Sequence, residues 1–104
     1  MAPADRRDTA IVNASGVATV TIRTQGRQVW TISQVSVEMS TAPSGSTCTL
    51  RKNGAFVSLL VAQGDAAGGD PPLTLRPSDT MTITWTGCTA GDLGAVYTVY
   101  EDGT

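Results

Sequence analysis

The stretch that decides the fold is RPSDTMTITWTGCTAGD, Arg76–Asp92. In its middle part, Thr80–Thr86, threonines alternate strictly with apolar residues, which are Met81, Ile83 and Trp85. Because successive side chains of a β-strand point to opposite faces, this pattern predicts a half-buried strand. The Pro77-Ser78-Asp79 segment before it is typical of a turn, since proline presets φ and the Ser and Asp side chains bond nearby amides.

The same alternation recurs along the chain between turn signals. The clearest turn is Asn53-Gly54, a pair that accepts the positive φ angles of a two-residue hairpin loop. The other strands are predicted at Thr9–Asn13, Val17–Thr24, Gln28–Met39, Thr47–Lys52, Ala55–Leu60, Leu73–Leu75 and Ala95–Glu101. With no convincing helix, the sequence predicts an all-β fold: an antiparallel β-sandwich of about eight strands, jelly-roll-like.

The strand predicted over Gln28–Met39 changes its pattern halfway. Apolar residues have one parity before Ser33 and the other parity after it: Trp30 and Ile32, then Val35, Val37 and Met39. One inserted residue reverses the parity, so a β-bulge near Ser33-Gln34 would keep all of them on one inward face. A strand buried on both faces is the alternative.

Composition argues against several classes of function. The 104 residues are the size of one domain, and the net charge of −2 comes from nine acids and seven scattered bases. Nucleic-acid binding needs a basic stripe, which is missing. The chain has no histidine, the usual general base and metal ligand. We therefore expect no enzyme activity, no catalytic, cofactor or metal site, and no nucleic-acid partner.

The apolar runs predict no membrane partner. The longest, such as Val57–Ala62, fall far short of the ~20 residues that span a bilayer. The first residues, MAPADRRDT, lack the apolar stretch of a signal peptide. We expect synthesis in the cytoplasm, where thiols stay reduced.

Potentially reactive residues have plainer interpretations. Cys48 and Cys88 lack the spacing of a redox pair and lack further metal ligands, so free thiols are favoured over a late disulfide, and catalysis comes third. The loop aspartates match no calcium motif. Trp30 and Trp85 are expected in the core, not on a sugar-binding platform. Tyr97 and Tyr100 have opposite parity, so at least one is expected at the surface.

Two segments are candidates for partner binding. Residues 1–8, MAPADRRD, are predicted to form a flexible arm before a single sandwich domain over residues 9–104. A frayed end and an arm that orders on a neighbouring subunit through Arg6 and Arg7 remain equal alternatives. Ala62–Pro72, AQGDAAGGDPP, is predicted to be an exposed loop, and its candidate contact residues are Asp65, Asp70 and Pro71.

Two longer stretches carry a family resemblance. These are RQVWTISQVSVEMS and, after a central cysteine strand, PLTLRPSDTMTITWTGCTAGDLGAVYTV. Over roughly Gln28–Tyr100 the chain resembles the small all-β virion proteins of tailed actinobacterial phages. The resemblance implies a capsid decoration (cement) protein on the capsid exterior. It implies binding to the major capsid protein, homo-oligomers that are often trimers, and no catalytic residues.

Two other functions remain as alternatives. The first is a tail- or fibre-associated or glycan-binding module of the virion, which would need Trp30, Trp85 or a tyrosine cluster exposed in a groove. The second is a bacterial surface or enzyme-accessory sandwich, which would need an export signal.

Overall fold

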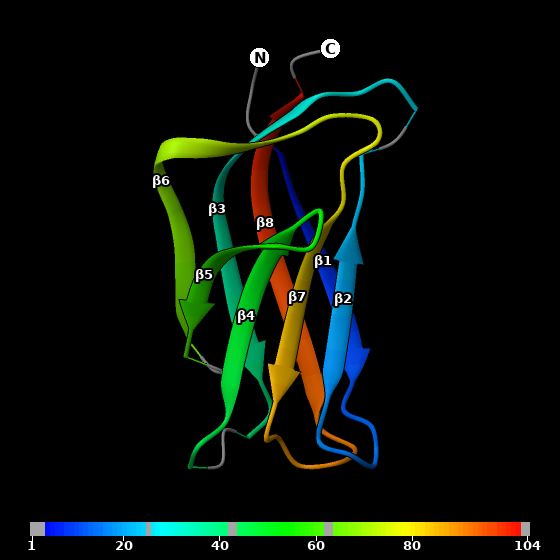
Figure 1. The fold of residues 1–104 in the computed structure, drawn as a ribbon, viewed down its shortest axis with the longest axis vertical. Coiled ribbons are helices and arrows are strands. Elements are labelled where there is room, and N and C mark those ends of the chain that lie inside the picture. The colour runs from blue at the N-terminus through cyan, green and yellow to red at the C-terminus, as the bar shows by residue number, and fades with distance from the viewer. Residues whose placement is uncertain (1–3, 25, 42–43, 62–63, 103–104) are drawn as a thin grey trace.

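The computed structural model describes residues 4–24, 26–41, 44–61 and 64–102. Over these residues the chain forms eight strands and no helix: β1 (Ala4–Ile11), β2 (Ala18–Ile22), β3 (Trp30–Met39), β4 (Thr47–Lys52), β5 (Ala55–Leu60), β6 (Asp65–Leu75), β7 (Met81–Thr86) and β8 (Leu93–Asp102). They build two four-stranded sheets, in the orders β1-β8-β3-β6 and β2-β7-β4-β5, that lie one behind the other (Figure 1). The paired strands are antiparallel, so the predicted antiparallel sandwich is confirmed.

The strand pairing is nested. β4 pairs with β5, β3 with β6, β2 with β7, and β1 with β8. The chain is therefore paired like one long hairpin, with Asn53-Gly54 at its tip, rolled into two layers. Asn53 and Gly54 have φ angles of 52° and 82°, which confirms the predicted turn.

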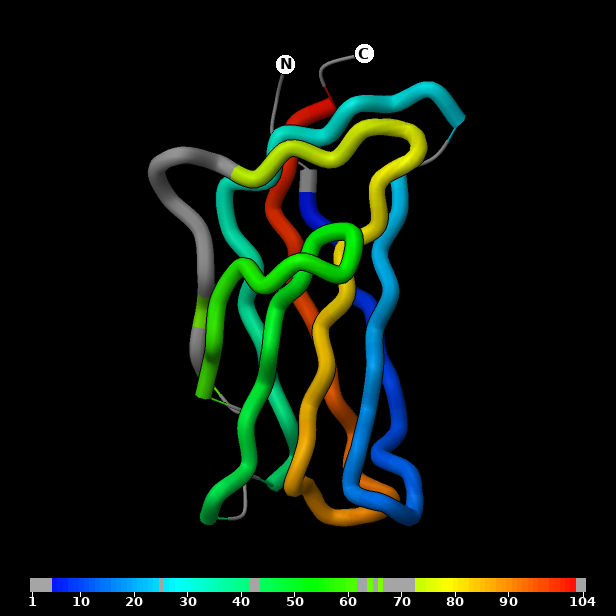
Figure 2. Tube along the Cα trace, viewed as in Figure 1, coloured from blue at the N-terminus to red at the C-terminus, as the bar shows by residue number. Residues whose placement is uncertain are grey.

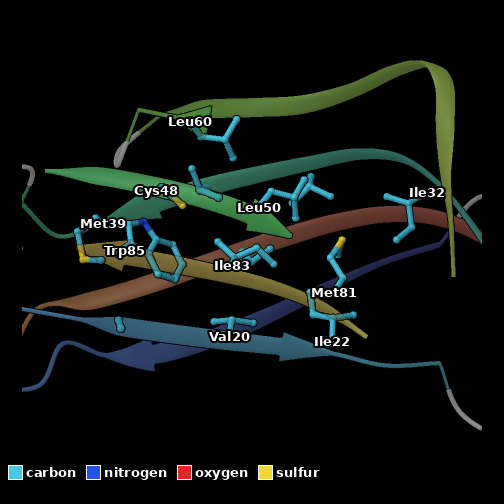
Figure 3. Packing of buried hydrophobic residues seen from close by; sticks show 14 of the residues in the cluster. Val20, Ile22, Ile32, Met39, Cys48, Leu50, Leu60, Met81, Ile83 and Trp85 are labelled. Atoms are coloured by element: carbon cyan, nitrogen blue, oxygen red, sulfur yellow. The ribbon is translucent and has the colours of Figure 1, made fainter. Parts of the chain in front are cut away.

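The core lies between the two sheets and is built from their inward-facing residues. Trp85, Ile83 and Met81 of β7 are fully buried and lie among residues of β2, β3 and β4 (Figure 3). On β8, Gly94 leaves room for the Trp85 ring: a Cβ at Gly94 would lie 3.1 Å from that ring and 3.0 Å from Met39 Cε. Burial of each large apolar side chain contributes about 1.5–3 kcal/mol.

The parity change in β3 is a β-bulge, as predicted. The register shifts between Ile32 and Gln34 in the pairing of β3 with both β6 and β8. Trp30 and Ile32 before the shift are buried, and so are Val35, Val37 and Met39 after it. The extra residue, Ser33, is exposed and donates its hydroxyl to the carbonyl of Val99 at 3.2 Å.

Two predicted irregular segments are strands instead. The prediction of a flexible arm is wrong from Ala4 onward, because β1 pairs with β8 from Ala4↔Tyr100 to Ile11↔Leu93. The sequence did not indicate a strand here because the charged residues of the segment give it little strand propensity. An edge strand nevertheless tolerates charge well. Residues 1–3 lie outside the described part of the chain.

The prediction of a Gly-rich loop is also wrong, since β6 begins at Asp65. Asp65–Gly68 pairs with Val37–Gln34, and pairing resumes at Leu73↔Ile32. The long strand β3 provides backbone partners for a segment whose own strand propensity is poor. Residues 62 and 63 lie outside the described part of the chain.

Candidate interaction surfaces

The adjacent arginines of β1 have opposite roles because they point to opposite faces of the strand. Arg6 donates from Nε and Nη2 to Oδ2 and Oδ1 of Asp8, at 2.9 and 2.8 Å. Its Cζ lies 5.3 Å from the ring centroid of Trp30, which stacks on Tyr100 with 4.2 Å between centroids. The hydrogen bonds to Asp8 raise the pKa of Arg6, although burial opposes this shift. Arg6 therefore covers the end of the core.

Arg7 lies on the outer face of the same sheet. Its Nε donates to the Tyr97 hydroxyl at 3.1 Å, and its Cζ is 5.7 Å from the Tyr97 ring centroid. Further along β1, Ile11 lies directly opposite Leu93, and both are exposed. We call Arg7, Ile11, Leu93 and Tyr97 the Arg7–Tyr97 surface. Tyrosine and arginine are residue types that often dominate the energy of protein interfaces.

A second exposed apolar surface lies on β5. Phe56 and Leu59 are 65% and 62% exposed, Val61 just after the strand is 64% exposed, and Val57 is 41% exposed. We call these four residues the β5 surface. Such exposure of neighbouring large apolar side chains is typical of contact sites.

The β5 surface continues into a face of threonines on β2, β7 and β4. The register aligns Thr19, Thr84 and Thr49 with Leu59, one residue from each strand. Two residues further along the pairing of β4 with β7, the hydroxyls of Thr47 and Thr86 are 2.8 Å apart. The outer face of this sheet is therefore covered with small side chains and borders on an apolar edge.

The two apolar surfaces lie at opposite edges of the sandwich. β1 packs beside β2 at one edge, and β5 packs beside β6 at the other. The Arg7–Tyr97 surface is on the outer face of one sheet, and the β5 surface belongs to the other sheet. One molecule could therefore hold two separate partners at once.

The structure does not unite the predicted contact residues into one site. Arg6 and Arg7 are on β1, whereas Asp65, Asp70 and Pro71 fall in β6, at the other edge of the same sheet. The side chains of these last three residues lie outside the described part of the structure. Sequence reasoning missed the β5 surface, although the apolar run from Val57 to Ala62 has too many large residues for one buried face.

Groups with reactive potential are engaged in structural roles. Cys48 is buried and Cys88 half-buried, and no disulfide joins them, so both are thiols, as favoured from the sequence. Burial raises the pKa of Cys88, and the charge of Asp92 adds to this, so its thiol is a weak nucleophile. Among the described residues, no group of three or more His, Cys, Asp or Glu side chains could hold a metal ion.

The remaining predictions about single residues concern the aromatic side chains. Trp30 and Trp85 are buried, as predicted, and neither offers a sugar-binding platform. Tyr97 is exposed whereas Tyr100 packs against the core, as their opposite parity indicated. In the part of the chain that the structure describes, no helix has the length and apolarity for crossing a membrane.

Comparisons with known proteins place the chain in no family. No protein-family model matches it, and no curated protein matches it. One solved structure is similar, the cryo-EM structure of the extra small virus (XSV) VLP of the giant freshwater prawn Macrobrachium rosenbergii. The similarity has a TM-score of 0.39 and 16% sequence identity, and covers 100% of this chain and 82% of that chain. A likeness this distant carries no weight in assigning a function.

Proposed function

We propose that the protein is a structural component of a virion, and more specifically a decoration (cement) protein. In this proposal it binds the major capsid protein on the outside of the shell and stabilises the shell. The observation that carries the proposal is the pair of exposed apolar surfaces at opposite edges of the sandwich. A protein that joins neighbouring subunits needs at least two contact surfaces on a body that resists deformation.

The contact residues suit a binding role. The Arg7–Tyr97 surface combines a cation, a phenol and two aliphatic side chains, and the β5 surface is purely apolar. Each surface by itself would support only a modest interface. Repetition of both contacts over a shell multiplies their effect, because each further contact of a bound molecule forms without a new loss of translational freedom.

The fold supports the same proposal. The nested pairing of the described strands supports a jelly roll, an architecture found in viral capsid domains as well as in lectins and cupins. Fold alone does not decide function. The choice among these classes rests on the two surfaces and on the sequence resemblance over Gln28–Tyr100.

The proposal has consequences for location and partners. It places the protein on the capsid exterior after synthesis in the host cytoplasm, as a homo-oligomer, without a cofactor or enzyme activity. A glycan-binding module of the virion is the weaker candidate, because both tryptophans that such a site would use are buried. A tail- or fibre-associated protein would bind isolated tails and leave the shells unlabelled.

The test is binding to purified capsids that lack this protein. We expect saturable binding with one fixed number of copies per shell, and greater resistance of the shell to heat. The variant Tyr97→Ala should weaken binding by about tenfold or more, the effect of removing one strong contact residue. Ser15→Ala, at an exposed turn position that belongs to neither surface, should bind like the wild type. Binding without saturation or a fixed stoichiometry would contradict the proposal.

A further inference from the structure

β5 differs from the other edge strands in the described part of the structure. Edge strands expose backbone groups that can pair with another chain, and proteins protect them with charges, prolines or short length. β1 carries the charges of Asp5–Asp8, β2 has five residues, and β6 contains Pro71-Pro72. Each of these three edges therefore has a feature that discourages pairing.

β5 lacks charge and proline. Its sequence, AFVSLL, is followed by Val61, and the segment 55–61 contains no charged residue, no proline and no glycine. It is the outermost strand of the nearer sheet in Figure 1, with β4 as its neighbour in the sheet. Its protective features are its short length of six residues and a bulge at Val57, where the register with β4 shifts between Leu50 and Arg51.

We propose that β5 pairs antiparallel with β5 of a second copy, about a two-fold axis. The bulge places this contact on the regular part of the strand, Ser58–Leu60. The two sheets then join into one continuous sheet, in the order β2-β7-β4-β5-β5-β4-β7-β2. Such a contact is isologous, since the same surface serves both copies, and it closes at the dimer without growing into a fibre.

The chemistry of β5 suits a copy of itself. Opposite residues in an antiparallel pair point to the same face, so Leu59, which is 62% exposed, would lie beside apolar residues of the second copy's β5. An uncharged strand places no like charges opposite each other in any register. The contact would cover part of the exposed apolar surface of Leu59.

The positive charges on the neighbouring strand β4 are too far apart to oppose the contact. Arg51 and Lys52 are on β4, and Lys52 lies 3.6 Å from Asp79, which offsets its charge. In the joined sheet the two β4 strands are separated by three strand spacings, roughly 14 Å. This exceeds the Debye length of about 8 Å at physiological ionic strength, so their repulsion is largely screened.

The dimer leaves both copies of the Arg7–Tyr97 surface accessible, because that surface is at the opposite edge of the sandwich. If the protein binds a shell, as proposed above, β5 then binds the second copy instead of a capsid subunit, and each dimer presents two Arg7–Tyr97 surfaces to the shell. The dimer itself forms whether or not the shell is the partner.

The test is sedimentation velocity of the full chain over a range of concentrations. We expect a reversible monomer–dimer equilibrium for the wild type. Leu59→Lys should raise the dissociation constant by roughly a hundredfold, since the dimer loses this contact in both copies at about tenfold each. Ile11→Lys is the matched control, because Ile11 is 61% exposed, Leu59 is 62% exposed, and each lies on an edge strand. It should dimerise like the wild type.

Hydrogen exchange locates the contact independently of mutation. Amides of Ser58–Leu60 that face away from β4 should exchange more slowly at high protein concentration than at low concentration, while those of β1 should not change. A wild type that stays monomeric at all concentrations would overturn the proposal. Equal weakening of dimerisation by Leu59→Lys and Ile11→Lys would also overturn it, because the two edges would then take part in one head-to-tail contact. Circular dichroism must show that both variants are folded, and capsid binding of the wild type tests the proposed function separately.

Discussion

The side-chain amide of Asn53 donates a hydrogen bond of 2.9 Å to Oδ1 of Asp79, 26 positions further along the chain. In return, the backbone amide of Thr80 donates to Asn53 Oδ1 at 2.9 Å. The backbone amide of Asn53 donates to the Thr80 carbonyl at 2.8 Å. The tip of the β4–β5 hairpin is thereby bound to the turn before β7, and the two meet in Figure 2. Asn53 thus connects two turns of the same sheet through its bonds to Asp79 and Thr80.

This connection predicts an acid-sensitive stability. Hydrogen bonds from the Arg76 amide and then from Asn53 lower the pKa of Asp79 below its ordinary 3.8. Because the pKa is lower in the folded state, the carboxylate stabilises the fold above the unfolded pKa. This stabilisation is lost as the pH falls through the folded pKa. In urea unfolding at several pH values, Asp79→Asn should be less stable than the wild type at neutral pH, and the difference should shrink below pH 3.8.

A second variant separates the contributions to this effect. Asn53→Gly keeps the positive φ of the turn but removes the side-chain donor. It should reduce the pH-dependent part of the stability without abolishing it, because the Arg76 amide still donates to Asp79 at 3.0 Å. Parallel stability–pH curves for the wild type and Asp79→Asn would contradict the assignment.

A side chain at Gly16 is expected to destabilise the fold. Its φ is +80°, and an added Cβ would lie 2.8 Å from the carbonyl oxygen of Cys88. Gly16→Ala should lower the free energy of unfolding by about 2–4 kcal/mol, from left-handed strain plus the clash. Gly91→Ala is the matched control, with φ +90° and no atom within 4 Å of its Cβ, and should cost only about 1–2 kcal/mol. If thermal unfolding gives equal losses of stability for Gly16→Ala and Gly91→Ala, the close approach of Gly16 to Cys88 has no effect on stability.

Thr98 offers a stabilising substitution. It is fully buried on β8, and its hydroxyl has no hydrogen-bond partner among the described residues. Valine has nearly the same shape without the unsatisfied polar group, so Thr98→Val should raise the free energy of unfolding by about 1 kcal/mol or more. Thr84→Val, on the outer face of β7, should change it by less than about 0.5 kcal/mol. A loss of stability in Thr98→Val would mean that the hydroxyl is satisfied.

Substitutions of Arg6 and Arg7 should affect different properties, the stability of the fold for Arg6 and capsid binding for Arg7. Arg6→Ala removes the cover over Trp30 and the pairing with Asp8, and should lower the free energy of unfolding by about 1 kcal/mol. Arg7→Ala should change stability by less than about 0.5 kcal/mol but weaken capsid binding together with Tyr97→Ala. The comparison needs chemical denaturation and the capsid-binding assay on both variants. Loss of binding in Arg6→Ala at unchanged stability would reverse these roles.

Local patterns predicted much of the fold because they depend on neighbouring residues. The bulge after Ile32, the Asn53-Gly54 turn and the buried face of Met81, Ile83 and Trp85 were all readable in the sequence. β1 and the first part of β6 were not, since charged or Gly-rich segments have little strand propensity of their own. They become strands because β8 and β3 provide backbone partners, and those partners are distant in sequence.

The sequence by itself determined that this chain forms an antiparallel sandwich with both tryptophans inside and without the histidine that much enzyme chemistry uses. The tertiary structure decided which apolar residues remain outside. Ile11 and Leu59 have the same apolar character as many core residues, and their exposure follows from the edges at which β1 and β5 lie. Strand order depends on long-range pairing, whereas alternation depends only on adjacent residues. The candidate contact surfaces therefore emerge only once the sheets are assembled.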